Sequence, residues 1–144
     1  MQTVLSRIAS IARPPVWIRQ ALKFLLVGVG NTALDALIYY LLTRGIPFFA
    51  AQPALAKGIS YSVGILNSFF WNRLWTFRSQ TRAGRTLLPY LLTNLSGLAL
   101  NTGMMQLGLR LLGLPEAVAF LLATAVTTGW NFVVSKFFVF RKAN

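Results

Sequence analysis

Residues 67–78 read Asn-Ser-Phe-Phe-Trp-Asn-Arg-Leu-Trp-Thr-Phe-Arg, and residues 130–141 read Trp-Asn-Phe-Val-Val-Ser-Lys-Phe-Phe-Val-Phe-Arg. Each stretch closes a long apolar run and ends on aromatic residues and an arginine. Each also sets a small polar residue beside a cation, Asn72-Arg73 in the first and Ser135-Lys136 in the second. This repetition predicts two copies of one membrane hairpin, with a cation at the same place in each copy.

The composition indicates a bilayer as the solvent. The chain has 144 residues, of which 56% are hydrophobic and 11% charged, and its mean hydropathy is +0.61. A soluble domain of this size is less apolar. The net charge is +12, from 14 cations against Asp35 and Glu116. Because the cations lie between apolar runs, we expect them to set topology and contact lipid headgroups, and we expect no nucleic-acid partner.

The sequence lacks most of the residue types that catalysis uses. The chain contains no cysteine and no histidine, which argues against thiol nucleophiles, histidine bases and most transition-metal sites. Its two acids are far apart, and no GxxxxGK phosphate loop occurs. The sequence therefore predicts a protein that is not an enzyme, with no catalytic residues, no metal and no cofactor.

Four apolar windows are long enough to cross a bilayer, at residues 22–43, 52–74, 87–111 and 116–138. The six prolines lie outside the span interiors by this reading, with Pro53, Pro89 and Pro115 at or next to span starts, where a missing N–H costs little. The predicted fold class is an all-α membrane protein of four transmembrane helices. Residues 21–144 form one domain, with repeat 1 at about 24–78 and repeat 2 at about 90–141.

Residues 1–20 are expected to lie on the membrane surface. Arg7, Arg13 and Arg19 alternate with apolar residues at helical spacing, and Pro14-Pro15 interrupts the run. The pattern predicts a short amphipathic interfacial helix rather than a cleaved signal, with a frayed tail as the alternative.

Cation placement predicts the orientation. Positive charges concentrate before the first span, between the second and third, and after the fourth, so both termini and the middle loop should be cytoplasmic. The two hairpins then form a parallel repeat in a multi-pass protein of the cytoplasmic (inner) membrane.

Asp35 and Lys57 are the charged residues expected deepest in the first hairpin. A carboxylate in hydrocarbon costs about 2.5–3.5 kcal/mol, and the two residues fall within roughly 5 Å in depth at the helical rise. We predict an intramembrane ion pair. Either the pair simply neutralises itself, or one member meets a proton or a substrate phosphate.

Two further polar sets are candidate binding residues. Arg73 and Lys136, with Asn72 and Ser135 beside them, suit a phosphate clamp, although each cation alone is an ordinary snorkelling anchor. Amides and aromatics could line a path for a headgroup, or the amides could simply bond between helices. The predicted path consists of Asn31, Asn67, Asn131, Trp71 and Trp75.

Small residues recur on the fourth span at Ala119, Ala123 and Thr127, with Ala125 and Gly129 on a neighbouring face. Such spacing allows close helix contact, either within one chain or between copies. We expect a homo-oligomer and favour a dimer.

The chain resembles the GtrA-like family of small four-span membrane proteins. The matching stretches are Lys23–Thr32, Asn67 with Asn72–Phe77, and the second-half segment Asn131–Phe140. By residue, the resemblance marks Asn31, Asn67, Asn72, Arg73, Trp75 and Phe77. The chain is also similar to the small membrane subunit of dolichol-phosphate mannose synthase. The second copy departs from the motif at Ser135-Lys136 and Val139, which implies that one half holds substrate while the other supports it.

The resemblance implies translocation of a polyprenyl-phosphate-linked sugar for cell-surface polysaccharide synthesis. One alternative is a non-catalytic membrane partner that anchors or stabilises a polyprenyl-phosphate glycosyltransferase. A weaker alternative is a small proton-coupled multidrug exporter that uses Asp35.

Overall fold

The computed structural model describes residues 14–141, and these residues are helical with short connections and no strand. The first hairpin consists of α2 (Val16–Gly45) and α4 (Pro53–Trp71), joined by the short α3 (Pro47–Ala51). The second consists of α5 (Ala83–Gln106) and α6 (Glu116–Val134). Single π-helical turns extend three of the helices: η1 (Asn72–Thr76) after α4, η2 (Leu107–Leu111) after α5 and η3 (Ser135–Val139) after α6.

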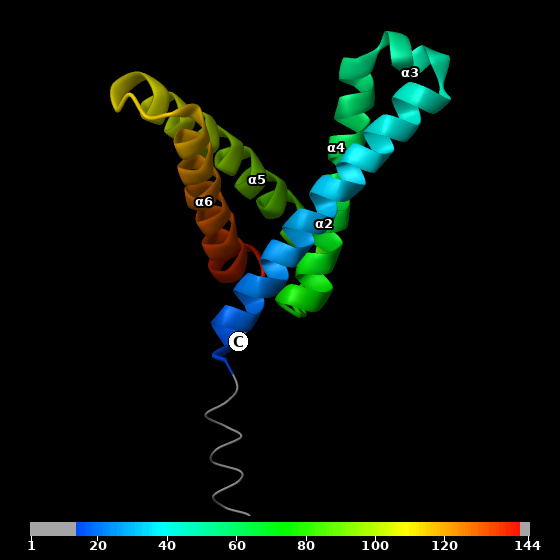
Figure 1. The fold of residues 1–144 in the computed structure, drawn as a ribbon. Helices are drawn as coiled ribbons and strands as arrows, with labels where there is room; N and C mark the ends of the chain where they lie inside the picture. Colours follow the sequence, from blue (N-terminus) through cyan, green and yellow to red (C-terminus); the bar gives the residue numbers. More distant parts are fainter. Residues whose placement is uncertain (1–13, 142–144) are drawn as a thin grey trace, which may run out of the picture.

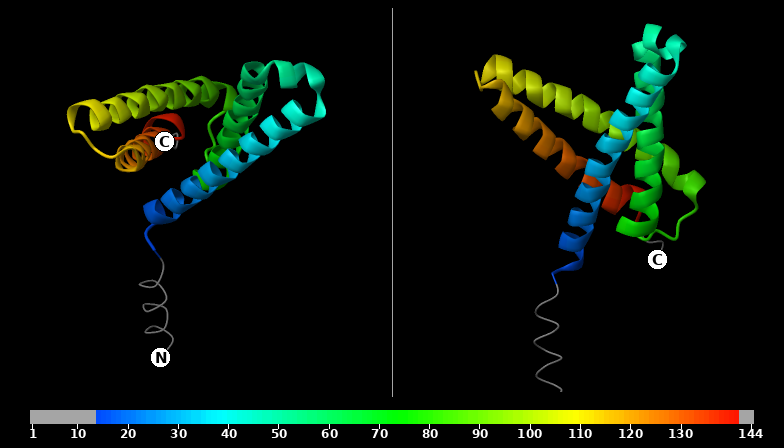
Figure 2. Two further views of the ribbon diagram at one scale, coloured as in Figure 1. Left: turned by 45° about the horizontal axis from the view of Figure 1, so that its top comes forward. Right: turned by 45° about the vertical axis from the view of Figure 1, so that its right-hand side comes forward.

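The two hairpins diverge like the arms of a V (Figure 1). Within each hairpin the helices pack along their length, whereas between hairpins the contacts are α2 with α6 and α4 with α5. The further views show the same separation of the two far ends (Figure 2). We call the end where the hairpins meet the base, and the ends that carry α3 and the 112–115 turn the tips.

An aromatic core joins the hairpins at the base. Phe77 and Phe140, the corresponding aromatics of the two sequence copies, stack with ring centroids 5.2 Å apart and planes inclined by 19°. Phe24 packs on Phe77 at 6.1 Å and on Phe132 at 5.6 Å. Aromatic pairs at these separations contribute roughly 0.5–1.5 kcal/mol beyond burial. The buried members of this core are Phe69, Phe77, Tyr90, Val139 and Phe140.

The duplicated sequence produces a duplicated backbone feature. The α-helix becomes a π turn at Asn72 in the first copy and at Ser135 in the second. Each turn closes on its phenylalanine: the Phe77 N–H donates to the Asn72 carbonyl (2.9 Å) and the Phe140 N–H to the Ser135 carbonyl (2.8 Å). A π turn inserts one residue into the helical register and is frequent at functional sites. Here it turns both phenylalanines toward the shared core.

The helices lie where the apolar windows are, with two differences at their starts. Two helices, Val16–Gly45 and Glu116–Val139, are long and apolar enough to cross a membrane, with mean hydropathies of 1.6 and 1.7. Pro89 lies inside α5, since this helix begins at Ala83, so the sequence placed the start too late. Residues 16–20, expected to belong to the interfacial segment, are the start of α2. The rest of that predicted segment, residues 1–13, lies outside the described residues.

Candidate functional site

A hydrogen-bonded triad of Ser68, Asn72 and Tyr90 ties the first hairpin to the second near the base. The Asn72 amide donates to Ser68 Oγ (3.2 Å) and to the Tyr90 hydroxyl (3.2 Å), and that hydroxyl donates to Ser68 Oγ (2.8 Å). Asn72 is 1% exposed and Tyr90 2%. In a water-poor surrounding such a network is strong when satisfied and costly when broken.

The triad borders a cavity of about 360 Å³ between the hairpins, which we call the interhairpin cavity. Its wall comes from all four long helices. The polar part of the lining includes Thr32, Ser68, Asn72, Tyr90, Asn94, Thr124, Thr128 and Asn131. The Asn72 and Asn131 amide oxygens are buried and accept no hydrogen bond from the described residues. A buried acceptor without a donor costs about 1–3 kcal/mol, so a donor that reached either oxygen would stabilise it.

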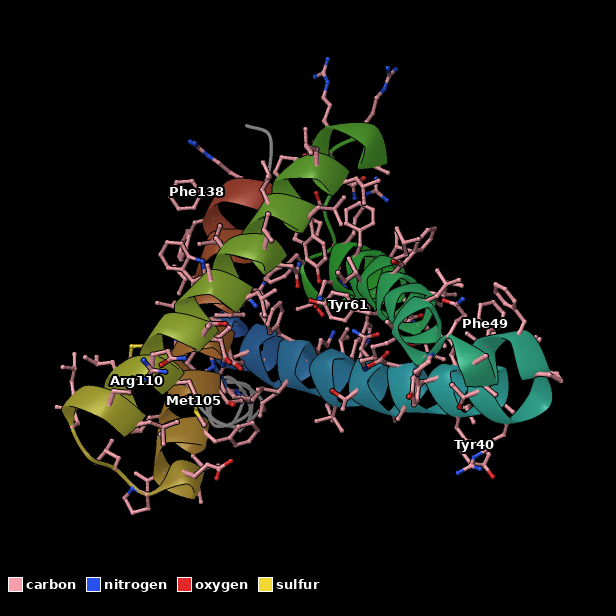
Figure 3. All side chains as sticks on the ribbon, turned by 90° about the horizontal axis from the view of Figure 1, so that it is seen from above. Tyr40, Phe49, Tyr61, Met105, Arg110 and Phe138 are labelled. Atoms are coloured by element: carbon pink, nitrogen blue, oxygen red, sulfur yellow. The ribbon has the colours of Figure 1, made fainter. Side chains whose placement is uncertain are left out.

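A second cavity of about 200 Å³ continues from the first toward the tips. Both cavities are lined by Gly28, Thr32, Ser68 and Asn94. The second also reaches Asp35 and Tyr61. Figure 3 shows Tyr61 on the side of α4 that faces the other hairpin, with Tyr40 and Phe49 at the far end of the first hairpin. Polar groups thus follow one another from the base into the middle of the bundle.

Asp35 and Lys57 form an ion pair between α2 and α4. Ser60 Oγ donates a second hydrogen bond to the Asp35 carboxylate, at 2.6 Å. The side chain of Asp35 is 18% exposed and that of Lys57 56%. Ser60 is buried, and the sequence reading missed it. Its position, three residues after Lys57 on one helix face, was the available signal.

The amides predicted to form a path take up two arrangements. The Asn67 amide donates to Asn31 Oδ1 at 2.7 Å, between α4 and α2. Asn131 instead lies against Gly97 of α5, where a Cβ would come within 3.0 Å of the Asn131 Cγ. If residues 24–26 are matched to residues 90–92, Gly97 stands where the first copy has Asn31. The second hairpin therefore uses an absent side chain to make room for its asparagine.

The predicted phosphate clamp is divided between local contacts. The Arg73 guanidinium donates to the Thr81 carbonyl at 2.7 Å. The Lys136 ammonium lies over the rings of Phe132 and Phe137, at 5.7 Å and 5.2 Å from their centroids. Asn72 and Ser135 are buried behind these cations. Neither cation lines the interhairpin cavity, so the clamp stays a prediction that the arrangement of the side chains does not by itself favour.

Trp71 at the end of α4 and Trp75 in η1 do not line the interhairpin cavity. With Asn67 and parts of α2 they line an apolar groove of about 500 Å³, which we call the lateral groove. Their rings contact each other edge to face, with centroids 6.5 Å apart. Asn67 thus borders the lateral groove, whereas Asn31, its hydrogen-bond partner, borders the second cavity of about 200 Å³.

Comparison with known proteins agrees with this architecture. The family model described as the GtrA/DPMS transmembrane domain matches residues 23–140. An uncharacterized membrane protein of Bacillus subtilis, YngA, is 32% identical over 120 residues, which are 82% of this chain and 77% of that protein.

A dolichol-phosphate mannosyltransferase of Pyrococcus furiosus is 28% identical over 142 residues, covering 94% of this chain. The match takes up 38% of that archaeal protein, so the chain corresponds to less than half of it. The family match spans both hairpins and both π turns at the base, from Lys23 to Phe140. The chain belongs to the GtrA/DPMS transmembrane domain family.

Proposed function

We propose that this protein translocates a polyprenyl-phosphate-linked sugar across the cytoplasmic membrane, without catalysing a covalent step. The observation that carries the proposal is the interhairpin cavity, with its buried, unpartnered Asn72 and Asn131 oxygens. Sugar hydroxyls are the donors that these acceptors lack. An apolar bundle gains nothing from a polar cavity unless a polar molecule enters it.

In this proposal all four long helices cross the membrane and the base is cytoplasmic. The described cations near the base outnumber those toward the tips, where Arg44, Lys57 and Arg110 lie, so the positive-inside rule favours this orientation. The cations on the basal side are Arg19, Lys23, Arg73, Arg78, Arg82, Arg85, Lys136 and Arg141. A basic cytoplasmic end also attracts an anionic lipid.

The sugar would enter near the triad and move along the shared wall of the two cavities toward Asp35. The ion pair at Asp35 then serves to neutralise the path, because its carboxylate is already bound by Lys57 and Ser60. The same pairing argues against a proton-coupled exporter that depends on a free carboxylate.

We propose a dimer as the working unit, built on the exposed face of α6. Ala119 and Ala123 are buried, each 1% exposed, so they pack within the hairpin. Ala125 and Gly129 are exposed and remain available for a second copy.

The test is transport of a polyprenyl-phosphate sugar in liposomes that contain only the purified protein. We expect wild-type transport, and a rate at least tenfold lower for Asn72→Ala and Thr128→Val, which remove groups from the cavity wall. Thr102→Val is the control, since this exposed threonine of α5 lies outside the cavity. Wild-type rates in both cavity variants would refute the route, and a folded wild type without transport would refute the flippase.

A second candidate function is a membrane partner of a glycosyltransferase. It is favoured by the match to part of the Pyrococcus furiosus dolichol-phosphate mannosyltransferase, most of which lies outside the matched region. The exposed Arg82 and Arg85, at the start of α5, offer a docking surface at the base. Co-purification with a transferase, and loss of its activity when this chain is removed, would support this candidate.

A further inference from the structure

We propose that a basic cavity at the base, together with the lateral groove, binds the phosphate and the isoprenoid chain of the carrier lipid. We call this cavity the basic cradle. The inference rests on the proposed function and adds where the lipid is held while its headgroup faces the interhairpin cavity. It assigns the phosphate to Arg19, Lys23 and Arg78 instead of Arg73 and Lys136.

The basic cradle has a volume of about 240 Å³ and lies between the start of α2 and the end of η1. Among the described residues, three cations line it and no carboxylate does. Cations with amide and hydroxyl donors beside them match the oxygens of a phosphate. Its principal lining residues are Arg19, Gln20, Lys23, Thr76, Phe77 and Arg78.

Two polar groups of the basic cradle are buried without a partner. Thr76 is 3% exposed, and its hydroxyl makes no hydrogen bond with the described residues. The Gln20 side-chain oxygen is also buried and unpartnered. A threonine hydroxyl can donate to an anion and rotates to suit it. The unpartnered hydroxyl is therefore explained if a phosphate occupies the cradle.

The backbone at Arg78 indicates that its side chain is required where it is. Arg78 has a φ of 49°, the left-handed conformation, and it is the only non-glycine residue with positive φ in the described chain. The turn after η2 has the same geometry with glycine: Gly113 has a φ of 61°. In both turns the next N–H reaches back six residues at 2.9 Å, from Ser79 to Arg73 and from Leu114 to Gly108. Strain of this kind is concentrated at functional sites.

The lateral groove begins where the basic cradle ends. The Lys23 ammonium donates to the Trp75 carbonyl (3.3 Å) and lies 4.8 Å above the Trp75 ring. Lys23 lines the cradle and Trp75 lines the groove, so this contact joins them. On α2, the residues that line them recur every three or four positions, which places them on one face. These residues are Arg19, Lys23, Leu26, Val27, Gly30 and Leu34.

A basic cradle that adjoins an apolar groove suits an amphiphile with an anionic head and an apolar tail. The groove lies between two neighbouring helices, α2 and α4 with η1, and it therefore suits one chain better than the paired chains of a diacyl phospholipid. Phe77 lines the cradle and also packs in the aromatic core. Phe77 packs on Phe24, which lines the interhairpin cavity, so this aromatic pair connects the cradle with that cavity.

The test is binding of radiolabelled polyprenyl phosphate to the full chain in phosphatidylcholine nanodiscs, with no sugar and no transport step. We expect Arg78→Gly to raise the dissociation constant at least about tenfold while the protein stays folded, because glycine fits this backbone better. Arg110→Ala is the matched control, since Arg110 is an exposed arginine near the tips that lines neither the cradle nor the lateral groove, and its dissociation constant should stay within twofold. Thr76→Val should weaken binding as a second, uncharged change.

Two competitors distinguish the source of the phosphate. Unlabelled polyprenyl phosphate should displace the label, whereas equal amounts of phosphatidylglycerol or of polyprenol without phosphate should not. Unchanged binding in Arg78→Gly, or equal displacement by phosphatidylglycerol, would overturn the inference. Binding that depends on Arg78 in a protein that does not transport would uphold the cradle and refute the flippase. If the wild type transports the lipid but Arg78→Gly does not change lipid binding, the flippase would be upheld and the cradle refuted.

Discussion

The first hairpin joins its two helices through an ion pair and an amide pair, whereas the second has one side-chain hydrogen bond, from Trp130 Nε1 to Ser96 Oγ at 2.9 Å, and packs mainly through small residues. In the first, an ion pair joins Asp35 to Lys57 and an amide pair joins Asn31 to Asn67. In the second, Gly108 approaches Ala119 so closely that a Cβ on it would lie 2.9 Å from the Ala119 Cβ. Two copies of one topology have thus reached helix contact by different chemistry.

This difference indicates that the two hairpins have different roles. Polar pairs in an apolar bundle can exchange partners with a bound headgroup, and they lie on the hairpin that carries the basic cradle and the lateral groove. Close backbone contact through glycine and alanine offers no such exchange but holds its geometry tightly. In the proposed function, the second hairpin is therefore the fixed wall of the interhairpin cavity, and the first is the wall whose polar groups can change partners.

Removing one member of the ion pair should have the largest effect. Lys57→Met leaves the Asp35 carboxylate with Ser60 alone, and we expect a loss of about 2–3 kcal/mol in the free energy of unfolding. Asp35→Leu combined with Lys57→Met should recover most of the loss, because no charge is then left alone. Reversible unfolding in mixed micelles measures both. A double variant as unstable as the single one would show that the pair does more than neutralise itself.

Glycine-to-alanine replacements should give the next largest effect, and their stability cost should differ between the two hairpins. Gly108→Ala is expected to cost about 1–3 kcal/mol, because the added methyl meets Ala119 across the helix contact. Gly64→Ala in the first hairpin should cost little or stabilise, since its Cβ would find Asp35 Cβ at 3.8 Å, an ordinary contact. Thermal unfolding of the two variants gives the comparison. Equal losses would mean that small residues matter alike in both halves.

The tie between the hairpins should be worth less than the ion pair and the Gly108 contact. Tyr90→Phe removes the hydroxyl that bonds Ser68 and Asn72, and we expect about 1 kcal/mol of destabilisation. Tyr61→Phe is the control, because Tyr61 is exposed and lies outside the triad. The melting temperatures of the two variants measure the effect. Indistinguishable values would show that the aromatic core alone joins the halves.

The amide pair should give the smallest change. Asn67→Ala breaks the bond to Asn31, and side-chain hydrogen bonds between membrane helices average about 0.6 kcal/mol. A double-mutant cycle with Asn31→Ala isolates the term from the effect of lost volume. A coupling energy above about 2 kcal/mol would place the pair on a level with the ion pair.

Hydropathy predicted the helix positions, because long apolar runs have few other solutions in a bilayer. The placement of Pro89 at a helix start was wrong, since this proline lies inside α5. The duplicated motif marked both π turns, but no local pattern distinguishes a π turn from an α turn before the packing of Phe77 on Phe140 is known. The sequence singled out Arg73 for its place in the repeated motif and offered no signal for Arg78. A positive φ at an arginine is a property of the folded turn and leaves no trace in composition.

Because the hairpins meet at one end, the molecule has the geometry of a lever with its fulcrum at the Phe77–Phe140 stack. The 30 residues of α2 extend for about 45 Å at the helical rise. The arm from Phe24, which packs on Phe77, to Gly45 is about 32 Å long, so a rotation of about 5° between the arms would move its tip by roughly 3 Å. A small rearrangement at the base is thereby magnified at the tips.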